Sequence, residues 1–210
     1  MGEVSREKTP YSREQLAETL RDEIDAKFPG AVNQDMLAML AAQIWIETSN
    51  GSKLFNNNPG NLIRSNPSAA SPGFWYRPTW WTDTSSKLHA KAHAKPPTAP
   101  QAFRAYMTLS DGMADYLDLL NNPKFEELII AARAGNPVRY GEAIKVSGYA
   151  PDWGPAQTRN LTGLYELAKG EFFPDEPETV EVDPKDNNAL AGLLAAGAVF
   201  VGAKWIFRKK

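Results

Sequence analysis

The feature that most limits how this chain can fold is a long apolar run near its carboxyl end. Residues 189–207 read ALAGLLAAGAVFVGAKWIF, with Lys204 as the one charged residue, and residues 208–210 form a basic tail. A helix of this length covers about 28 Å, which is close to the thickness of a bilayer core. The run is apolar on all sides, which favours a transmembrane anchor over a buried helix of a globular domain. We therefore expect residues 189–207 to span a membrane.

The same run could also bring copies of the chain together. Small side chains recur at three- and four-residue spacing, at Ala191, Ala195, Ala198 and Gly202. Such spacing allows membrane helices to approach closely, so a homo-oligomer through this helix is one expected arrangement. The positive-inside rule places the basic tail on the cytoplasmic side and the rest of the chain across the membrane.

The segment before the run is acidic and contains three prolines. Residues 170–188 read GEFFPDEPETVEVDPKDNN, with seven acidic residues against one lysine. We interpret this composition as an extended linker, because it cannot bury enough apolar area to fold. Residues 1–10 are expected to be a loose arm, and residues 11–169 a single folded domain. Residues 1–30 lack the apolar core of a signal peptide.

The composition excludes several classes of function. Apolar residues make up 42% of the chain and charged residues 23%, as in globular proteins. The net charge of −2 gives no bulk attraction to nucleic acid, so we expect no such partner. The absence of cysteine excludes disulfides and thiol catalysis. His89 and His93 are flanked by lysines without a nearby carboxylate, so neither a metal nor another cofactor is expected.

Local signals predict a mainly α-helical domain. Ser12 with Gln15 fits a capping box for a first helix that ends near residue 28, and Asn33 can cap a second helix that reaches Glu47. Apolar periodicity predicts further helices after Ser110, after Pro123 and over residues 137–147 and 155–169. Residues 48–101 are rich in Asn, Pro, Ser and Gly, and we interpret them as a small lobe of loops and short strands.

Glu47 is the best candidate for a catalytic residue. It follows Leu40 by seven positions and Ile44 by three, so it shares their apolar helix face. Apolar surroundings raise the pKa of a carboxyl group toward the range that is useful for a general acid. The helix is expected to end at residues 49–51, which would open the side chain to a cleft. By position alone, most glutamates of this kind are ordinary surface residues in a last helical turn.

Three segments of the chain together resemble one enzyme family. Residues 42–63 read AQIWIETSNGSKLFNNNPGNLI, residues 103–125 read FRAYMTLSDGMADYLDLLNNPKF, and residues 148–166 read GYAPDWGPAQTRNLTGLYE. In this order they are similar to the conserved blocks of the glucosaminidases of glycoside hydrolase family 73, which include autolysins and flagellar-type muramidases. The resemblance implies a lysozyme-like α+β fold with Glu47 as the acid and Tyr149 in the catalytic site. Asn50 stands where the family often has tryptophan.

Glycoside hydrolysis normally needs a second carboxylate as base or nucleophile. Asp83 is the one acidic residue between Glu47 and Asp111, and in the family the proposed partner comes from the equivalent lobe. Asp83 is therefore the leading candidate, and Asp152, close to Tyr149 in the third segment, is the alternative.

Several residues are candidates for binding the sugar. Aromatic side chains of the lobe can stack on pyranose rings, or they can form a small satellite core. Arg104 is expected to support the wall of the cleft. The candidates for substrate binding are Asn58, Asn61, Trp75, Trp80, Trp81, Tyr106 and Asp152.

The resemblance and the anchor together imply a peptidoglycan hydrolase of the endo-N-acetylglucosaminidase type. A cell-wall enzyme with an anchor but no signal peptide suits a bacteriophage lysin that is carried in the virion and acts at the bacterial cell envelope. One alternative is a lytic transglycosylase that acts on the same substrate. The other is a non-catalytic glycan-binding protein whose anchor forms a membrane channel.

Overall fold

The computed structural model of this chain describes residues 2–62, 74–76 and 103–174. The described residues all belong to one compact unit, which ends at Asp175. The expected anchor at residues 189–207 and the candidates Trp80, Trp81 and Asp83 lie outside the described residues. No helix within the described part is long and apolar enough to cross a membrane.

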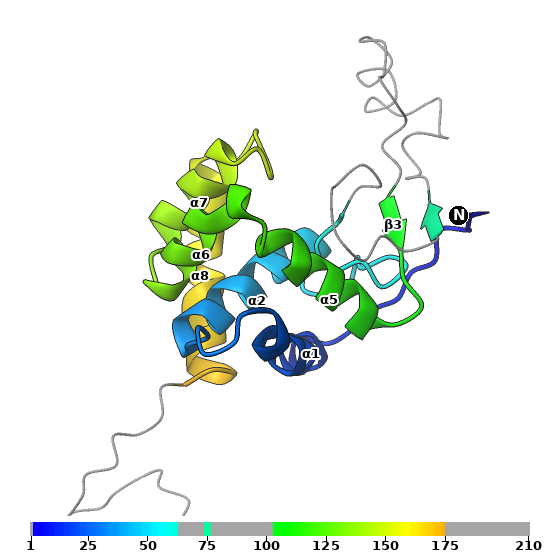
Figure 1. Cartoon of the computed structure of the whole chain (residues 1–210), viewed down its shortest axis with the longest axis horizontal. Helices are drawn as coiled ribbons and strands as arrows, with labels where there is room; N and C mark the ends of the chain where they lie inside the picture. Colours follow the sequence, from blue (N-terminus) through cyan, green and yellow to red (C-terminus); the bar gives the residue numbers. More distant parts are fainter. Residues whose placement is uncertain (1, 63–73, 77–102, 175–210) are drawn as a thin grey trace, which may run out of the picture. The chain divides into compact units, whose positions relative to one another are not determined.

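Six α-helices dominate the described residues, as expected for a mainly α-helical domain (Figure 1). A 3-10 turn, η1 (Pro123–Phe125), precedes the fourth of them. The helices are α1 (Arg13–Lys27), α2 (Gln34–Thr48), α5 (Leu109–Leu120), α6 (Glu126–Arg133), α7 (Pro137–Val146) and α8 (Pro155–Glu171).

The predicted helix starts are confirmed because their capping groups are local. The Ser12 hydroxyl accepts a hydrogen bond from the Gln15 backbone N–H, and the Gln15 side chain accepts one from the Ser12 N–H. The Asn33 side chain accepts from the Met36 N–H at 2.8 Å. Both arrangements satisfy backbone donors that a helix leaves unpaired at its first turn.

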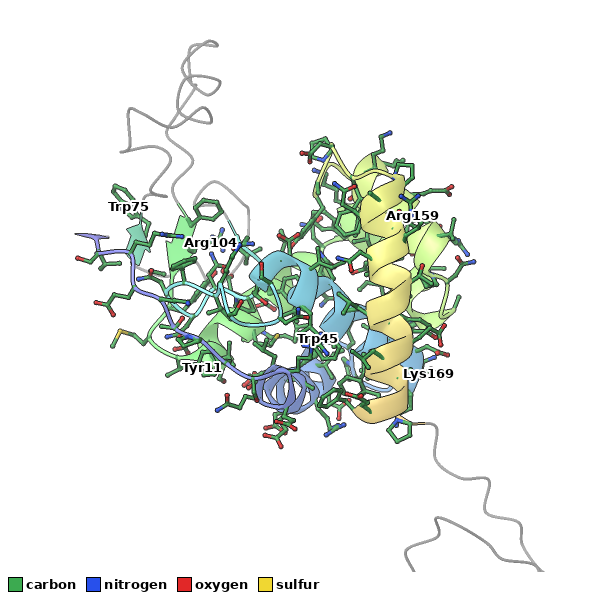
Figure 2. The ribbon with its side chains drawn as sticks, turned by 180° about the vertical axis from the view of Figure 1, so that it is seen from behind. Tyr11, Trp45, Trp75, Arg104, Arg159 and Lys169 are labelled. Atoms are coloured by element: carbon green, nitrogen blue, oxygen red, sulfur yellow. The ribbon has the colours of Figure 1, made fainter. Side chains whose placement is uncertain are left out.

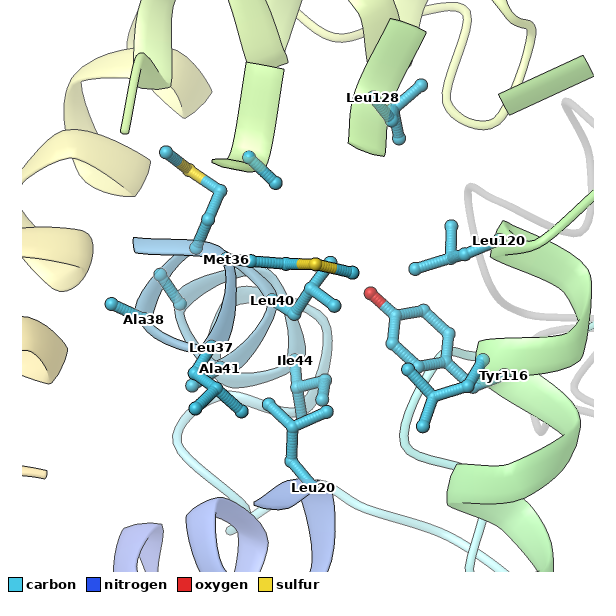
Figure 3. Packing of buried hydrophobic residues seen from close by; sticks show 14 of the residues in the cluster. Leu20, Met36, Leu37, Ala38, Leu40, Ala41, Ile44, Tyr116, Leu120 and Leu128 are labelled. Atoms are coloured by element: carbon cyan, nitrogen blue, oxygen red, sulfur yellow. The ribbon is translucent and has the colours of Figure 1, made fainter. Parts of the chain in front are cut away.

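Helix α2 lies at the centre of the core. Its residues from Met36 to Trp45 are all buried, and it packs against α1, α6 and α8. Figure 3 shows Leu20 of α1, Tyr116 and Leu120 of α5 and Leu128 of α6 arranged around its side chains. Because apolar side chains surround this helix, its carboxyl end is firmly held at the boundary between the core and the following loop.

Helix α8 packs along α2 and connects to it through polar contacts as well. Lys169, near the carboxyl end of α8 in Figure 2, donates to the Asp35 carboxylate at 2.7 Å, and Tyr165 donates to the same oxygen. Burial raises the pKa of Asp35, but the hydrogen bonds from Lys169 and Tyr165 outweigh it and leave the pKa below its usual value. The contacts of Asp35 with Lys169 and Tyr165 therefore join the start of α2 to the carboxyl half of α8.

Within the expected lobe of loops and short strands, residues 48–101, one strand is described, and it joins two strands from outside that range in a small sheet. Strand β2 (Phe74–Tyr76) pairs in parallel with β1 (Gly2–Glu3) and antiparallel with β3 (Phe103–Ala105), and Trp75 lies opposite Arg104. The first strand brings the amino-terminal segment into the lobe.

Packed residues extend beyond both expected ends of the domain, residues 11 and 169. The arm predicted to be loose is bound to the loop after α2, since Thr9 N–H donates to the Leu54 carbonyl at 3.0 Å and Lys8 pairs with Phe55. At the other end α8 continues past the expected boundary at residue 169, and Phe173 is 1% exposed. The first residues of the expected linker therefore belong to the packed domain.

Candidate active site

Glu47 lies in the last turn of α2, where the core meets the loop. The helix ends just after it, as predicted, because Ser49 adopts a left-handed conformation with φ of 49°. The residues around it in the helix, Gln43, Ile44 and Thr48, are buried, whereas Glu47 is partly exposed. Its carboxyl group is thus held at the end of a buried helix, on a residue that is partly exposed as a whole.

Asn61 holds the carboxyl group of Glu47 from the loop side. Its Nδ2 donates to the backbone carbonyl of Glu47 at 2.8 Å and to Oε2 of the carboxylate at 3.0 Å. Asn61 has a φ of 48°, a left-handed conformation that asparagine tolerates better than most residues. Asn61 was predicted to bind substrate, and the structure places it in contact with the candidate acid itself.

A second group of polar side chains surrounds Gln43, one helical turn before Glu47. Gln43 is fully buried, and its Oε1 accepts hydrogen bonds from the hydroxyls of Tyr116, at 3.0 Å, and Tyr140. These two tyrosines come from α5 and α7, so three helices meet at one amide oxygen (Figure 3 shows the Tyr116 hydroxyl directed toward α2).

Tyr149 connects this group to the loop. Its hydroxyl donates to the Gly60 carbonyl at 2.9 Å, and its ring meets Phe125 edge-on. Glycine is required at position 60, because a Cβ there would lie 2.4 Å from Cδ2 of the Tyr116 ring. The turn that carries Asn61 is therefore packed against two tyrosines of the cluster.

The environment makes Glu47 a weaker acid than a free glutamate. Burial raises the pKa of Glu47, the charge of Asp152 raises it further, and the hydrogen bond from Asn61 lowers it. The predicted direction of the pKa shift is confirmed, although the surroundings include polar groups. Burial raises the pKa of Tyr116, Tyr140 and Tyr149, and the charge of Glu47 adds to this effect.

Of the two candidates for the second carboxylate, the structure describes one. Asp152 is exposed in the turn between α7 and α8, and it is close enough for its charge to act on Glu47. Asp83 lies outside the described residues. Tyr149, predicted to be catalytic, belongs to the same turn as Asp152, and its hydroxyl contacts the Gly60 carbonyl of the loop.

Asn58, predicted to bind substrate, supports the loop from inside the domain. The side chain is fully buried. Its Nδ2 donates to the carbonyls of Leu62 and Arg104 at 3.0 and 3.1 Å, and its Oδ1 accepts from the Leu62 N–H at 2.8 Å. The amide is occupied by backbone groups that define the loop.

Tyr106, also predicted to bind substrate, is an interior residue as well. It is buried, and its hydroxyl donates to the Asp115 carboxylate. Arg104 binds the same carboxylate oxygen at 2.5 Å, so the pair lies behind the loop and not at its surface. Trp75 is partly exposed in β2 and stays a candidate for sugar binding.

Sequence reasoning missed the buried polar residues that organise the site, namely Gln43, Tyr116, Tyr140 and Asp115. A signal for two of them was present. Gln43 is the one polar side chain within the apolar stretch over residues 36–46, and Asp115 interrupts the apolar stripe of α5. Polar residues at such positions need partners inside the fold.

Comparisons with models of protein families, with curated proteins and with solved structures gave no match. Among the described residues, no group of three or more histidine, aspartate or glutamate side chains could hold a metal ion. The chemistry of the site therefore has to be inferred from the groups around Glu47.

Proposed function

We propose that this protein is a glycosidase that cuts the β-1,4 linkages of peptidoglycan strands, with a lysozyme-like arrangement and Glu47 as the general acid. The observation that supports this most is the state of the Glu47 carboxyl group. It lies at the end of a buried helix, on a residue that is partly exposed as a whole, and burial of the carboxyl group raises its pKa. These are the properties that a carboxylic acid needs to stay protonated until it meets a glycosidic oxygen.

In the proposed reaction Glu47 donates its proton to the leaving glycosidic oxygen. A second carboxylate would activate water or attack the anomeric carbon. Asp152 suits this role because it is exposed and close enough for its charge to act on Glu47. Asp83 is the other candidate for this role. Trp75, partly exposed in the central strand of the small sheet, is the candidate for stacking on a sugar ring.

A lytic transglycosylase is the second candidate function. In the described part of the chain, the groups that contact Glu47 or surround Gln43 are amides and phenols, and Asp152 is exposed. One carboxyl group suffices for transglycosylation, because a hydroxyl of the sugar itself attacks the anomeric carbon. The product is then an anhydro sugar in place of a new reducing end.

The test is digestion of purified peptidoglycan with the full chain and four variants. Glu47→Gln should abolish the release of fragments, and the matched control Glu142→Gln, at an exposed glutamate of α7, should leave it unchanged. Asp152→Asn and Asp83→Asn each test one candidate for the second carboxylate. Mass spectrometry distinguishes reducing ends from anhydro ends, and full activity of Glu47→Gln would overturn the proposal.

We also propose that residues 189–207 attach the protein to a membrane, as a virion-borne lysin at the cell envelope would require. The apolar length of this run supports the proposal. The full chain should float with lipid vesicles in a density gradient, whereas a chain that ends at residue 188 should not. Equal behaviour of the two chains would refute the anchor.

A further inference from the structure

We propose that Asn61 is a positioning residue for Glu47, which fixes the orientation of the carboxyl group and assigns its proton to the oxygen Oε1. It does so through one amide nitrogen that contacts both the backbone and the side chain of the candidate acid. The catalytic meaning of this inference rests on the proposed function, but the contacts themselves do not.

The amide nitrogen of Asn61 uses both of its hydrogens on Glu47. Nδ2 donates to the Glu47 backbone carbonyl at 2.8 Å and to Oε2 of the carboxylate at 3.0 Å. This carbonyl lies in the last turn of α2, and the N–H four residues on, that of Gly51, donates to the Thr48 hydroxyl. The carboxyl group is therefore held relative to the backbone of its own residue, and rotation away from Asn61 breaks the contact.

The two carboxylate oxygens of Glu47 have different surroundings. Oε2 accepts the hydrogen bond from Asn61, whereas Oε1 has no hydrogen-bond partner within the described residues. In a protonated carboxyl group the carbonyl oxygen is the better acceptor, and the hydroxyl oxygen carries the donor. The contact with Asn61 therefore makes Oε2 the carbonyl oxygen and leaves the proton on Oε1. This is the oxygen that can donate to a glycosidic oxygen.

The turn that carries Asn61 is held by contacts that do not involve Glu47. The buried Asn58 side chain accepts from the Leu62 N–H at 2.8 Å and donates to the Leu62 carbonyl at 3.0 Å, which closes the turn over residues 58–62. The Gly60 carbonyl accepts from the Tyr149 hydroxyl at 2.9 Å. The amide of Asn61 is thus brought to the carboxylate by the fold of the loop, so the acid is oriented before a substrate binds.

The charges around Glu47 give this contact a measurable signature. The titratable groups that interact with Glu47 in the described part of the chain carry no positive charge, and they are Asp152 in the turn after α7, Tyr116 of α5, Tyr140 of α7 and Tyr149. Burial and the charge of Asp152 raise the pKa of Glu47, and the hydrogen bond from Asn61 lowers it. Loss of this hydrogen bond alone should raise the pKa, whereas a loosened site that admits water should lower it.

The first test is an NMR titration of the full chain. Asn61→Gly removes the amide and suits the positive φ of this position. Asn50→Gly is the matched control, because Asn50 also has a positive φ, of 59°, and its side chain accepts from Arg13 in an exposed contact. The pKa of Glu47 is followed through its carboxyl ¹³C shift, with Glu47→Gln for assignment. Asn61→Gly should raise this pKa and Asn50→Gly should leave it unchanged.

An unchanged or lowered pKa in a folded Asn61→Gly protein would overturn the inference. Should this variant fail to fold, Asn61→Asp takes its place, because aspartate has nearly the same size and tolerates a left-handed conformation but offers no donor when ionised. The new carboxylate should raise the pKa of Glu47 as well, since a like charge disfavours ionisation.

Infrared spectroscopy tests the assignment of the proton to Oε1. The carbonyl stretch of the protonated Glu47 carboxyl group is isolated at acid pH as a difference spectrum against Glu47→Gln. A carbonyl that accepts a hydrogen bond absorbs at a lower frequency than one that does not, so Asn61→Gly should move this band to higher frequency. An unmoved band would show that Asn61 donates to the hydroxyl oxygen, and would refute the assignment.

The titration and the infrared spectrum need no enzymatic activity, so the two proposals can fail separately. A raised pKa in a chain without glycosidase activity would support the orienting contact and refute the proposed function. If the chain is active, Asn61→Gly should lower kcat by up to about 100-fold, change KM less, and shift the alkaline limb of the pH profile upward. An unchanged kcat would refute the positioning role.

Discussion

Replacing Asp115 with alanine should destabilise this protein far more than replacing Asp118, although both belong to ion pairs on the same helix. Asp115 and Arg104 are 0% and 2% exposed and 2.5 Å apart, and the Tyr106 hydroxyl donates to the same carboxylate oxygen. Without the carboxylate, a guanidinium group and a phenol stay buried beside a cavity. Breaking a buried pair in this way costs about 3–5 kcal/mol.

Asp118 provides the matched control. It pairs with Lys27 at 2.7 Å, but the two side chains are 21% and 26% exposed, so water screens the pair. Such a pair is worth about 0–1 kcal/mol. At about 2–4 °C per kcal/mol for a domain of this size, Asp115→Ala should lower the Tm by about 6–20 °C and Asp118→Ala by about 4 °C at most.

The assay is thermal unfolding of the full chain, followed by circular dichroism at one protein concentration and one pH. Equal decreases in Tm for the two variants would refute the argument from burial. Arg104→Met combined with Asp115→Leu should restore much of the lost stability, because a buried pair can often be replaced by apolar residues of similar volume.

Three further predictions concern the site and the domain boundary. The pKa of Glu47 in the folded state lies above its value of 4.5 in an unfolded chain, so the wild type loses stability as the pH rises from 4.5 through the folded-state pKa. Glu47→Gln should therefore have a higher Tm than the wild type near about pH 7 but not near about pH 4. A lower Tm of the variant at neutral pH would contradict this sign. Phe173→Ala should lower the free energy of unfolding by about 3–5 kcal/mol in denaturant unfolding, because the residue is 1% exposed. The control Val146→Ala, at an 87% exposed position, should change it by about 0.5 kcal/mol or less. Gly60→Ala should lower the free energy of unfolding by about 1–3 kcal/mol, since the new methyl group meets the Tyr116 ring. It should also raise the pKa of Glu47 by moving Asn61 away from the carboxylate, and an unchanged NMR titration of Glu47 would contradict this.

The helices could be predicted because their signals are local. The capping contacts join Ser12 to Gln15 and Asn33 to Met36, in each case three residues apart. The apolar periodicity that predicts a helix is likewise a property of one continuous segment of sequence. The end of α2 just after Glu47, and hence the position of the candidate acid, followed from the same local information.

The groups around the acid could not be predicted in this way. Gln43 meets Tyr116 and Tyr140, which are 73 and 97 residues away in the sequence, and no local pattern specifies such a contact. The carboxyl boundary was placed too early for a related reason. Residues 170–188 are acidic on average, and this average composition predicted a linker for the whole segment. Phe172 and Phe173 at its start nevertheless pack on the helical core.

The three consecutive asparagines of the loop have a consequence for the order in which the protein assembles. Asn56 binds the backbone of Ser5 and Glu7, and Asn57 binds the Tyr11 hydroxyl and the Tyr106 carbonyl. Asn58 binds the Arg104 carbonyl, and all these contacts join residues that are 46 to 51 positions apart in the sequence. Contacts between such distant segments form slowly, because long loops must close first. We therefore expect α2 to form early and the loop with Asn61 to dock late, so that Glu47 acquires its hydrogen-bond partner in one of the last steps of folding.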